Sequence, residues 1–531
     1  MRPRKSHFAS LTVLVLWIMG VSVHAEELAE VRPLPTKLAL DQEHLGLSLG
    51  EAFHLTTGQC ADCRTPKPAL WYFGNEIIAV PSNPDYQDGR DHNELPFLVW
   101  VGSHDVIESA ELTEDGRHVR TADGQELGVQ LAPKLVTNRS YFNEATQRFF
   151  SGRPLRLRGE ILNTAEGRGF EARTIWPTDW RFTPETARKP SDSPSLPDLI
   201  EGTWTPGQQA LITHTLWTGN TPRSNWNGRP VFGVILNGAQ GDDDEALGGH
   251  VGIFTGRMGA HGEWADWLVN NFYDPDWVSE KGILPAMVPM DNYLGDLNSG
   301  QAYYRPSYLL VMVLKQDRVP VAYQRAIQQD FSALYRHVVD YDHAQSNCAG
   351  LSIDALRALG WHIPLQGPTS LLKAVAAVPY VTVTDRSFAK GLNAYHYLAE
   401  EQSRLLPRIM FEAIGTDLLA LLNGDRSGHM LTTFEQWVKN DTEAVLFVQI
   451  PQIPSSRAWG AAPVRSLVEY EQRAPKDRKD WKIIPVPPRP FPENLREVPS
   501  SSFSWTSTAL LLSVPLGVVL VWIQQRRKTS L

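Results

Sequence analysis

An uncharged apolar segment lies near each end of the chain, and these two segments constrain its fold more than any other feature. The first, ASLTVLVLWIMGVSV, follows the basic residues Arg2, Arg4 and Lys5 and precedes Val23-His24-Ala25. A basic start, a short apolar centre and small residues at the cleavage position are typical of a secretory signal peptide. We therefore expect cleavage after Ala25. The alternative, a permanent N-terminal anchor, is disfavoured because the run is short for a bilayer.

The second segment runs from Phe503 to Ile523 without a charge and is followed by QQRRK. About 20 apolar residues cross the hydrocarbon core of a bilayer, so this segment is expected to be a transmembrane helix. The basic residues Arg526, Arg527 and Lys528 predict a cytoplasmic tail at 524–531, with the bulk of the chain outside. A tail removed by a sorting enzyme is the alternative.

Between these ends the composition is that of a folded protein, with 42% hydrophobic and 21% charged residues and a net charge of −9. The acidic balance argues against a nucleic-acid partner. Changes in composition divide the chain at Pro- and Ser-rich stretches. We expect a β-rich region at 26–182, a linker at 183–198, a catalytic domain at 199–425, a mixed α/β extension at 426–482 and a proline-rich stalk at 483–502.

The chain has three cysteines, and two of them form the motif GQCADC. In an oxidising compartment, Cys60 and Cys63 are expected to form a local disulfide. A haem site is excluded because Arg64 stands where the CxxCH motif requires histidine. Cys348 is then the odd cysteine, and such a residue is either buried and inert or a reactive thiol.

A strand-like segment, His250 to Phe254, follows the strand-like run Val231 to Leu236 and an acidic loop. Alternation along a strand places His250, Gly252 and Phe254 on one face. Flanking glycines leave space around the histidine ring. A polar residue at a loop edge is the plainer interpretation.

The stretch SNCAGLSIDALRALGW is expected to be a helix, capped by Asn347 or Ser346 and ended by Gly360. Its predicted inner stripe consists of Leu351, Ala355, Leu356 and Leu359 and leaves out Cys348, which lies in the first turn. There the helix dipole favours a thiolate, and the first backbone N–H groups are suited to hold an oxyanion. A structural cysteine remains the alternative.

A cysteine opening a helix and a histidine on a strand are the residue types that a thiol nucleophile and its general base require. GGHVGIF followed much later by NCAGLSIDAL resembles the permuted branch of the NlpC-type papain-like superfamily, whose order lecithin-retinol-acyltransferase-like proteins share. The resemblance covers roughly residues 230 to 360. It implies an α+β, papain-like catalytic domain with Cys348 as nucleophile and His250 as base.

A looser likeness concerns LVNNFYDPDW, from Leu268 to Trp277, and the helical stretch before Asn347. These resemble a periplasmic domain of bacterial lipoprotein N-acyltransferases. The predicted signal peptide and the segment 503–523 together indicate a protein anchored in the bacterial inner membrane and facing the periplasm. In the N-acyltransferase family a Cys–His pair takes an acyl chain onto sulfur and passes it to an amine, and this chain departs from the family pattern in having one anchor helix and an additional N-terminal β domain. The expected activity is a cysteine hydrolase or acyltransferase working through a thioester on lipid or lipoprotein acyl groups. A peptidoglycan peptide amidase and a non-catalytic envelope scaffold are the alternatives.

A third catalytic residue is expected on the strand after His250, where a polar group orients the histidine. If a turn occupies about 256–260, antiparallel counting places Asp266 opposite His250, while the spacing of His261 is closer to the superfamily pattern. Each residue could equally be a solvated turn residue. Neither a cofactor nor a metal site is predicted.

Overall fold

The computed structural model describes the helices and strands named below and some of the connections between them. The signal segment, Cys60 with Cys63, the stalk and the segment 503–523 lie outside the described residues. The described residues are 32–33, 53–57, 77–81, 99–103, 105–132, 144–164, 167–188, 194–201, 209–220, 225–238, 249–273, 284–295, 306–335, 339, 341–426 and 430–453.

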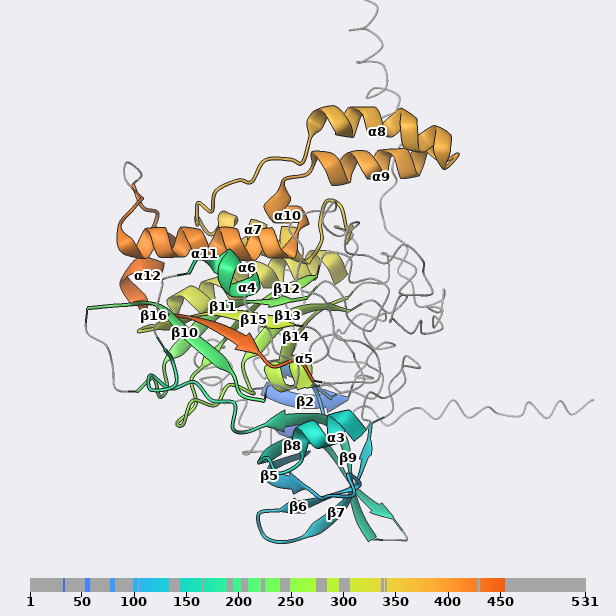
Figure 1. Ribbon diagram of the computed structural model, residues 1–531, viewed down its shortest axis with the longest axis vertical. Coiled ribbons are helices and arrows are strands. Elements are labelled where there is room, and N and C mark those ends of the chain that lie inside the picture. Colours follow the sequence, from blue (N-terminus) through green and yellow to red (C-terminus); the bar gives the residue numbers. More distant parts are fainter. Residues whose placement is uncertain are drawn as a thin grey trace, which may run out of the picture.

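The largest element is an eleven-stranded mixed sheet (Figure 1). Its centre is formed by apolar strands such as PVFGVILN and SYLLVMVL, which are buried along their whole length because both faces of the sheet are covered. In spatial order the strands are β1 (Arg32–Pro33), β2 (Phe53–Thr57), β3 (Ile77–Pro81), β4 (Val99–Gly102), β14 (Leu284–Pro289), β13 (Leu268–Tyr273), β12 (His250–Arg257), β11 (Pro230–Asn237), β15 (Ser307–Leu314), β16 (Thr442–Ile450) and β10 (Ile212–Thr218).

A closed five-stranded barrel lies on one side of this sheet. Its interior is filled by fully buried apolar side chains, among them Val119, Leu157 and Phe170. Closure comes from a parallel pairing of β7 with β9, which leaves no free edge. The strands are β5 (Asp105–Leu112), β6 (His118–Thr121), β7 (Glu126–Leu131), β8 (Leu155–Thr164) and β9 (Gly167–Pro177), and helix α3 (Glu144–Phe150) precedes β8.

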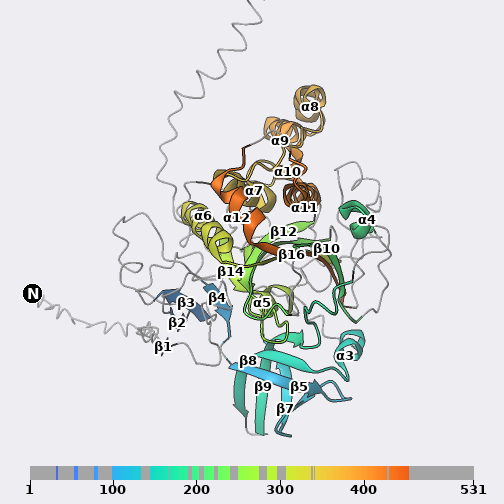
Figure 2. The same cartoon turned by 90° about the vertical axis from the view of Figure 1, so that its left-hand side faces the viewer.

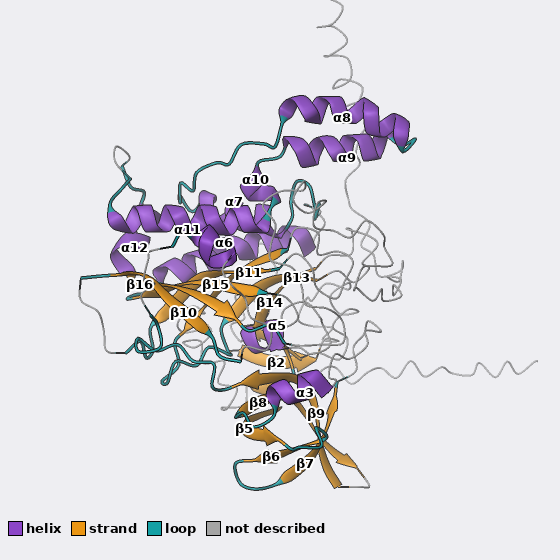
Figure 3. Ribbon diagram, in the orientation of Figure 1, coloured by secondary structure: helices purple, strands orange, loops and turns teal. Residues whose placement is uncertain are grey.

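Helices cover the opposite face of the sheet, as Figure 3 shows. Helices α6, α7 and α11 pack on strands β11 and β12, whereas α5 lies between the sheet and barrel strand β9. The helices that complete the described body are α4 (Leu196–Glu201), α5 (Met290–Gly295), α6 (Arg318–Tyr335), α7 (Cys348–Ala358), α10 (Gln402–Leu405), α11 (Pro407–Asn423) and α12 (Thr433–Asp441).

A helical hairpin projects from this body in both views (Figures 1 and 2). It consists of α8 (Leu371–Thr384) and α9 (Phe388–Ala399), capped by Ser370 and Ser387 respectively. The helices approach each other closely at Gly391, where a Cβ would lie 2.3 Å from the Thr382 hydroxyl oxygen and 2.6 Å from the Val378 carbonyl oxygen. Any larger residue there would push the two helices apart.

Buried charges join the barrel to the sheet. Arg158 on β8 donates from Nε to Asp291 of α5 at 2.8 Å, and Arg156 contacts the same carboxylate at 3.2 Å. Arg158 and Asp291 are each only 1% exposed at the side chain. Burial alone would lower the pKa of Arg156, but the charges of Asp266 and Asp291 raise it above its usual value. The two units are therefore connected by a desolvated ion network.

The predicted α+β class is confirmed. The division expected at residue 425 does not separate two sheets, because β16 inserts between β15 and β10 of the large sheet. Strands β1 to β4, from the region expected to be a separate β-rich unit, also join that sheet. No helix within the described ranges is both long and apolar enough to span a bilayer.

Candidate functional site

Cys348 is the first residue of helix α7, where the sequence places it. Asn347 caps the helix, accepting hydrogen bonds from the backbone N–H groups of Ala349 at 2.9 Å and Gly350 at 3.0 Å. The helix ends at Ala358, and Gly360 follows with a φ of +96°, a conformation that glycine adopts at little cost. The predicted cap at Asn347 and the predicted stop at Gly360 are both confirmed.

The thiol of Cys348 is buried, with the residue 4% exposed. It shares the buried face of α7 with Ser352 and Leu356, whereas Leu351, expected on the inner stripe, is partly exposed. The expectation that the cysteine lies off the inner stripe is therefore wrong. Burial raises the pKa of the Cys348 thiol, so desolvation outweighs the helix dipole that was expected to favour a thiolate.

The first-turn N–H groups are already used. Two of them bond to the Asn347 side chain, and the N–H of Cys348 donates to the Tyr341 hydroxyl at 3.2 Å. The N–H groups of Cys348 and Ala349 nevertheless also lower the pKa of the Cys348 thiol, so the expectation that first-turn donors hold an oxyanion stays a prediction. Donors from outside the first turn contact the sulfur as well.

Two such donors point at the sulfur itself. The backbone N–H of Val251 and the hydroxyl of Tyr341 form hydrogen bonds with Cys348, and both lower the pKa that burial raises. Val251 follows His250 directly in strand β12, and α7 packs on this strand. The fold thus brings the start of β12 to the start of the cysteine helix, although about 100 residues separate them in the sequence. Alternation along β12 puts Val251 on the face that α7 covers and directs the His250 side chain to the opposite face, toward Tyr293 of α5.

His250 begins strand β12 and is partly exposed. Its Nε2 lies 3.0 Å from the side-chain oxygen of Asn271 on strand β13. Strand β13 pairs with β12 at Phe254 and Val269, so the alternation of side chains puts Asn271 on the same face as His250. Asn271 is 3% exposed, and its amide oxygen fixes the imidazole orientation from a desolvated position.

Strand β11 and helix α5 provide further polar side chains next to His250. Asn237 is the cross-strand partner of His250, and its side chain accepts a hydrogen bond from the Tyr293 hydroxyl. Asn237 also donates to Ser307 at 2.7 Å. The Tyr293 ring lies 6.2 Å from the His250 ring between centroids. A chain of buried polar contacts thus supports the strand position that presents His250.

Aromatic rings surround the other side of Cys348. Tyr341, whose hydroxyl contacts the cysteine, lies 5.5 Å from Phe272 between ring centroids, and Phe272 lies 5.7 Å from Phe331. His343 packs edge-on against Tyr341 at 5.3 Å, and burial lowers the pKa of His343 although Asp342 opposes the shift. The sulfur is therefore flanked by apolar surface on the side that Tyr341 faces.

The structure places the two predicted third residues elsewhere. Strand β12 continues to Arg257 and β13 starts only at Leu268, so the expected turn at 256–260 and the pairing of Asp266 with His250 are wrong. Asp266 instead joins the ion network, 3.0 Å from Arg156. His261 lies in the connecting loop, where its backbone N–H donates to Glu263.

Sequence reasoning did not identify Asn271 or Tyr341 as site residues. Asn271 is the second residue of an Asn-Asn pair, and only the strand register decides which of the two faces His250. Its neighbour Asn270 faces away and donates to Tyr323 of α6 at 3.3 Å. Tyr341 lies in an irregular segment, and no periodic pattern in the sequence marks it.

A cavity of about 720 Å³ lies beside α11 and is distinct from this site, since Cys348, His250 and Asn271 do not line it. His362, Asp417 and Arg426 line it among others, and these side chains are engaged in ion pairs or hydrogen bonds with their neighbours. Across the described ranges there is no group of three histidine, cysteine or acidic side chains positioned to hold a metal ion.

Comparison of the chain with models of known protein families, with curated proteins and with solved structures found no match.

Proposed function

We propose that the chain is a cysteine-dependent acyltransferase or hydrolase in which Cys348 is the nucleophile, His250 the general base and Asn271 a positioning residue. The contact between His250 Nε2 and Asn271 at 3.0 Å is the observation that carries the proposal. A cysteine, a histidine and an asparagine that orients the histidine form the catalytic set of papain-like enzymes. Packing of the cysteine helix on the histidine strand supports a permuted papain-like arrangement, whereas the alternation of β12, which turns the His250 side chain away from that helix, does not.

With Nε2 engaged by Asn271, proton transfer uses His250 Nδ1, and it requires the imidazole, at the first residue of β12, to reach the sulfur around the end of the strand. The Cys348 proton moves to Nδ1 as the sulfur attacks the carbonyl carbon of an ester or amide, giving a tetrahedral oxyanion. Collapse breaks the bond to the alcohol or amine, which leaves with the proton from His250. The resulting thioester is then attacked by water or by an amine, and Cys348 recovers its proton. Tyr341 and the Val251 N–H, which hydrogen-bond to the sulfur, are candidate donors for stabilising the oxyanion.

The raised pKa of Cys348 has a consequence for this mechanism. A buried thiol rests in its neutral form, so the nucleophile forms only when His250 takes the proton. This makes the orientation of the imidazole decisive and gives Asn271 its role. It also protects a free thiol from oxidation in an oxidising compartment.

The substrate class follows from the surroundings of the sulfur. A thiol on a residue only 4% exposed, beside Tyr341 and Phe272, fits a slender acyl chain better than a branched peptide. We therefore favour lipid or lipoprotein acyl groups in an enzyme anchored in the inner membrane and facing the periplasm. A peptidoglycan amidase is the second candidate. Burial of the sulfur equally favours a non-catalytic envelope scaffold, which the experiment below distinguishes.

Intact-mass and peptide spectrometry of the full chain, purified in detergent, tests the nucleophile. We expect an acyl adduct on Cys348, or labelling of Cys348 by an acyl-phosphonate or fluorophosphonate-type probe, and its loss in Cys348→Ala. Unchanged labelling of a folded Cys348→Ala variant would exclude Cys348 as the nucleophile. A wild-type chain that forms no adduct with lipid, lipoprotein or peptidoglycan donors would favour the scaffold.

A matched pair of variants tests the positioning residue. Asn270 and Asn271 are adjacent, of the same type and 4% and 3% exposed, but only Asn271 contacts His250. Asn271→Ala is expected to slow adduct formation about 10- to 100-fold, as is typical when the partner that orients a functional histidine is removed. Asn270→Ala should leave the rate nearly unchanged. Equal effects of the two substitutions would show that the contact has only a structural role.

A further inference from the structure

Helix α8 is amphipathic, but its apolar stripe faces away from the rest of the protein. The outward stripe consists of Leu372, Val375, Tyr380 and Val383, spaced by three, five and three residues so that they share one side of the helix. Ala376 and Pro379 fill the intervening positions of the same side. The opposite side of α8 packs against α9, and Ala374 of α8 and Gly391 of α9 are buried between the two helices.

This surface is too exposed to belong to the core. Leu372 is 84% exposed, Val383 76% and Tyr380 71%. Of the eleven exposed large hydrophobic side chains among the described residues, seven lie between Leu371 and Leu392. Contiguous exposed apolar patches on soluble surfaces mark sites of interaction with a partner or a membrane. Figures 1 and 2 show the hairpin standing clear of the body.

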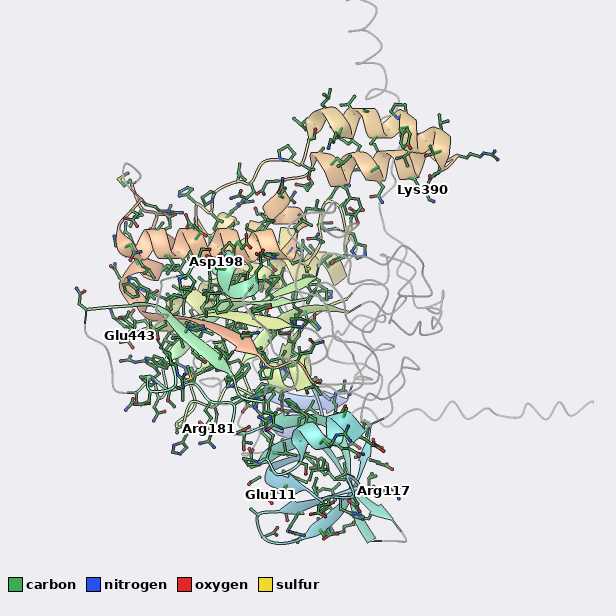
Figure 4. The ribbon with its side chains drawn as sticks, in the orientation of Figure 1. Glu111, Arg117, Arg181, Asp198, Lys390 and Glu443 are labelled. Atoms are coloured by element: carbon green, nitrogen blue, oxygen red, sulfur yellow. The ribbon has the colours of Figure 1, made fainter. Side chains whose placement is uncertain are left out.

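The charge of the hairpin differs from that of the rest of the chain. Its basic residues Lys373, Arg386 and Lys390 outnumber its one acidic residue, Asp385, whereas the whole chain has a net charge of −9. Figure 4 shows Lys390 extending outward at the tip, where it pairs with Asp385 at 3.1 Å. Basic residues beside an exposed apolar stripe are the composition of helices that lie at an anionic lipid surface.

The base of the hairpin is firmly attached to the cysteine helix. Glu401, which follows α9, accepts hydrogen bonds from Arg357 of α7 at 2.8 and 3.3 Å. Arg404 of α10 pairs with Asp354 of α7 at 2.9 Å. The hairpin is thus a projection fixed to the helix that begins at Cys348.

We propose that the α8–α9 hairpin docks on the surface of a lipid bilayer, burying the outward stripe among headgroups and upper acyl chains while its basic side chains meet anionic phosphates. A bilayer is the occupant we favour because the same chain carries an uncharged apolar segment, Phe503 to Ile523, followed by Arg526, Arg527 and Lys528. On the proposed anchoring of that segment in the inner membrane, the hairpin belongs to a chain already held at a bilayer. The charge of the hairpin complements an anionic membrane and not this acidic chain itself.

Photocrosslinking of the full chain in vesicles tests this proposal. The vesicles contain a roughly three-to-one mixture of phosphatidylcholine and phosphatidylglycerol, to provide anionic charge. One lipid carries a diazirine high on its acyl chain, and crosslinked peptides are mapped by mass spectrometry. We expect crosslinks between residues 371 and 392, quantified against those in 503–523 as an internal standard, and weaker hairpin labelling in pure phosphatidylcholine.

Two charge-matched variants provide the contrast. Leu372→Glu with Val383→Glu places two carboxylates on the outward stripe and should lower the hairpin-to-anchor labelling ratio about tenfold, equivalent to about 1.4 kcal/mol. Gln366→Glu with Asn393→Glu adds the same charge at exposed polar positions and should change the ratio by less than about twofold, a difference below 0.5 kcal/mol.

Labelling confined to 503–523, or equal hairpin labelling in both variants, would overturn the proposal. Repeating the measurement with Cys348→Ala separates this inference from the proposed function, since docking requires no thiol chemistry. A hairpin that labels normally in that variant keeps the docking proposal even if no acyl adduct is ever found.

Discussion

Replacement of Arg158 by methionine should destabilise the chain more than any exposed ion-pair substitution. Arg158 donates to Asp291 at 2.8 Å and to Asp266 at 3.3 Å, and Asp291 is fully buried. Removing one partner of a buried pair leaves an uncompensated charge and typically costs about 3–5 kcal/mol. Because Arg156 still contacts Asp291 at 3.2 Å, we expect the lower part of that range for Arg158→Met.

The double variant is the sharper measurement. Arg158→Met with Asp291→Leu replaces the pair by apolar side chains, a change that is often close to neutral at buried sites. The double variant should therefore be more stable than the sum of the single losses predicts, with a coupling energy of about 2–3 kcal/mol. Arg148→Met is the control, because Arg148 and its partner Glu144 are 73% and 89% exposed and the loss of this pair should cost less than about 1 kcal/mol.

Denaturant unfolding followed by tryptophan fluorescence reports on this interface directly. Trp176 of barrel strand β9 lies 4.7 Å from Trp264, in the loop that leads to β13, between ring centroids. Separation of barrel and sheet therefore changes the emission of this pair. Single-variant losses that simply add in the double variant, or a loss no larger than that of Arg148→Met, would refute the interpretation of the network as a coupled interdomain contact.

Two further predictions concern buried titratable groups. Tyr341→Phe leaves the buried Cys348 N–H without its acceptor, which should cost about 1–2 kcal/mol of stability. The substitution also removes a hydrogen bond that lowers the Cys348 pKa, so the pH dependence of Cys348 alkylation should shift to higher pH. An alkylation profile that stays unchanged or shifts to lower pH would contradict this. Burial and the charge of Asp354 raise the pKa of Asp330 from 3.8 to about 6. Because this folded-state pKa exceeds the unfolded value, the stability of the chain should fall as pH rises between about 4 and 6. Asp330→Asn should therefore be more stable than wild type near about pH 7, by about 1 kcal/mol after solvent screening. Near about pH 4 the two proteins should have equal denaturant midpoints.

Local signals in the sequence predicted the elements that carry the site. The Asn347 cap and the Gly360 stop define α7 through short-range hydrogen bonding and backbone conformation, which a single sequence displays. The apolar run of β11 and the alternation at His250 likewise indicate the strands. Each of these features depends on residues within about one turn or strand of each other.

Long-range pairing explains what the sequence did not predict. Asp266 was assigned to His250 by counting across a turn, but a longer loop moves the start of β13 to Leu268 and selects Asn271 instead. The true partner of Asp266, Arg156, lies 110 residues earlier in the barrel. The exposure of α8 could not be predicted from the sequence either. Its apolar residues have the composition of a core helix, and only the fold shows that no described element covers the outward stripe.

The positions of the hairpin and the barrel determine which part of the molecule would face a membrane. The sheet separates the helical layer from the barrel, so the hairpin and the barrel lie at opposite ends of the described structure (Figures 1 and 2). Salt bridges from Arg357 and Arg404 connect the hairpin to α7, and the Arg158–Asp291 contact connects the barrel to α5. A hairpin seated on a bilayer would therefore hold Cys348 on the membrane side of the sheet and turn the barrel away from the lipid. On this arrangement the barrel is the part free to meet a second substrate or partner, while an acyl chain reaches the thiol from the membrane side.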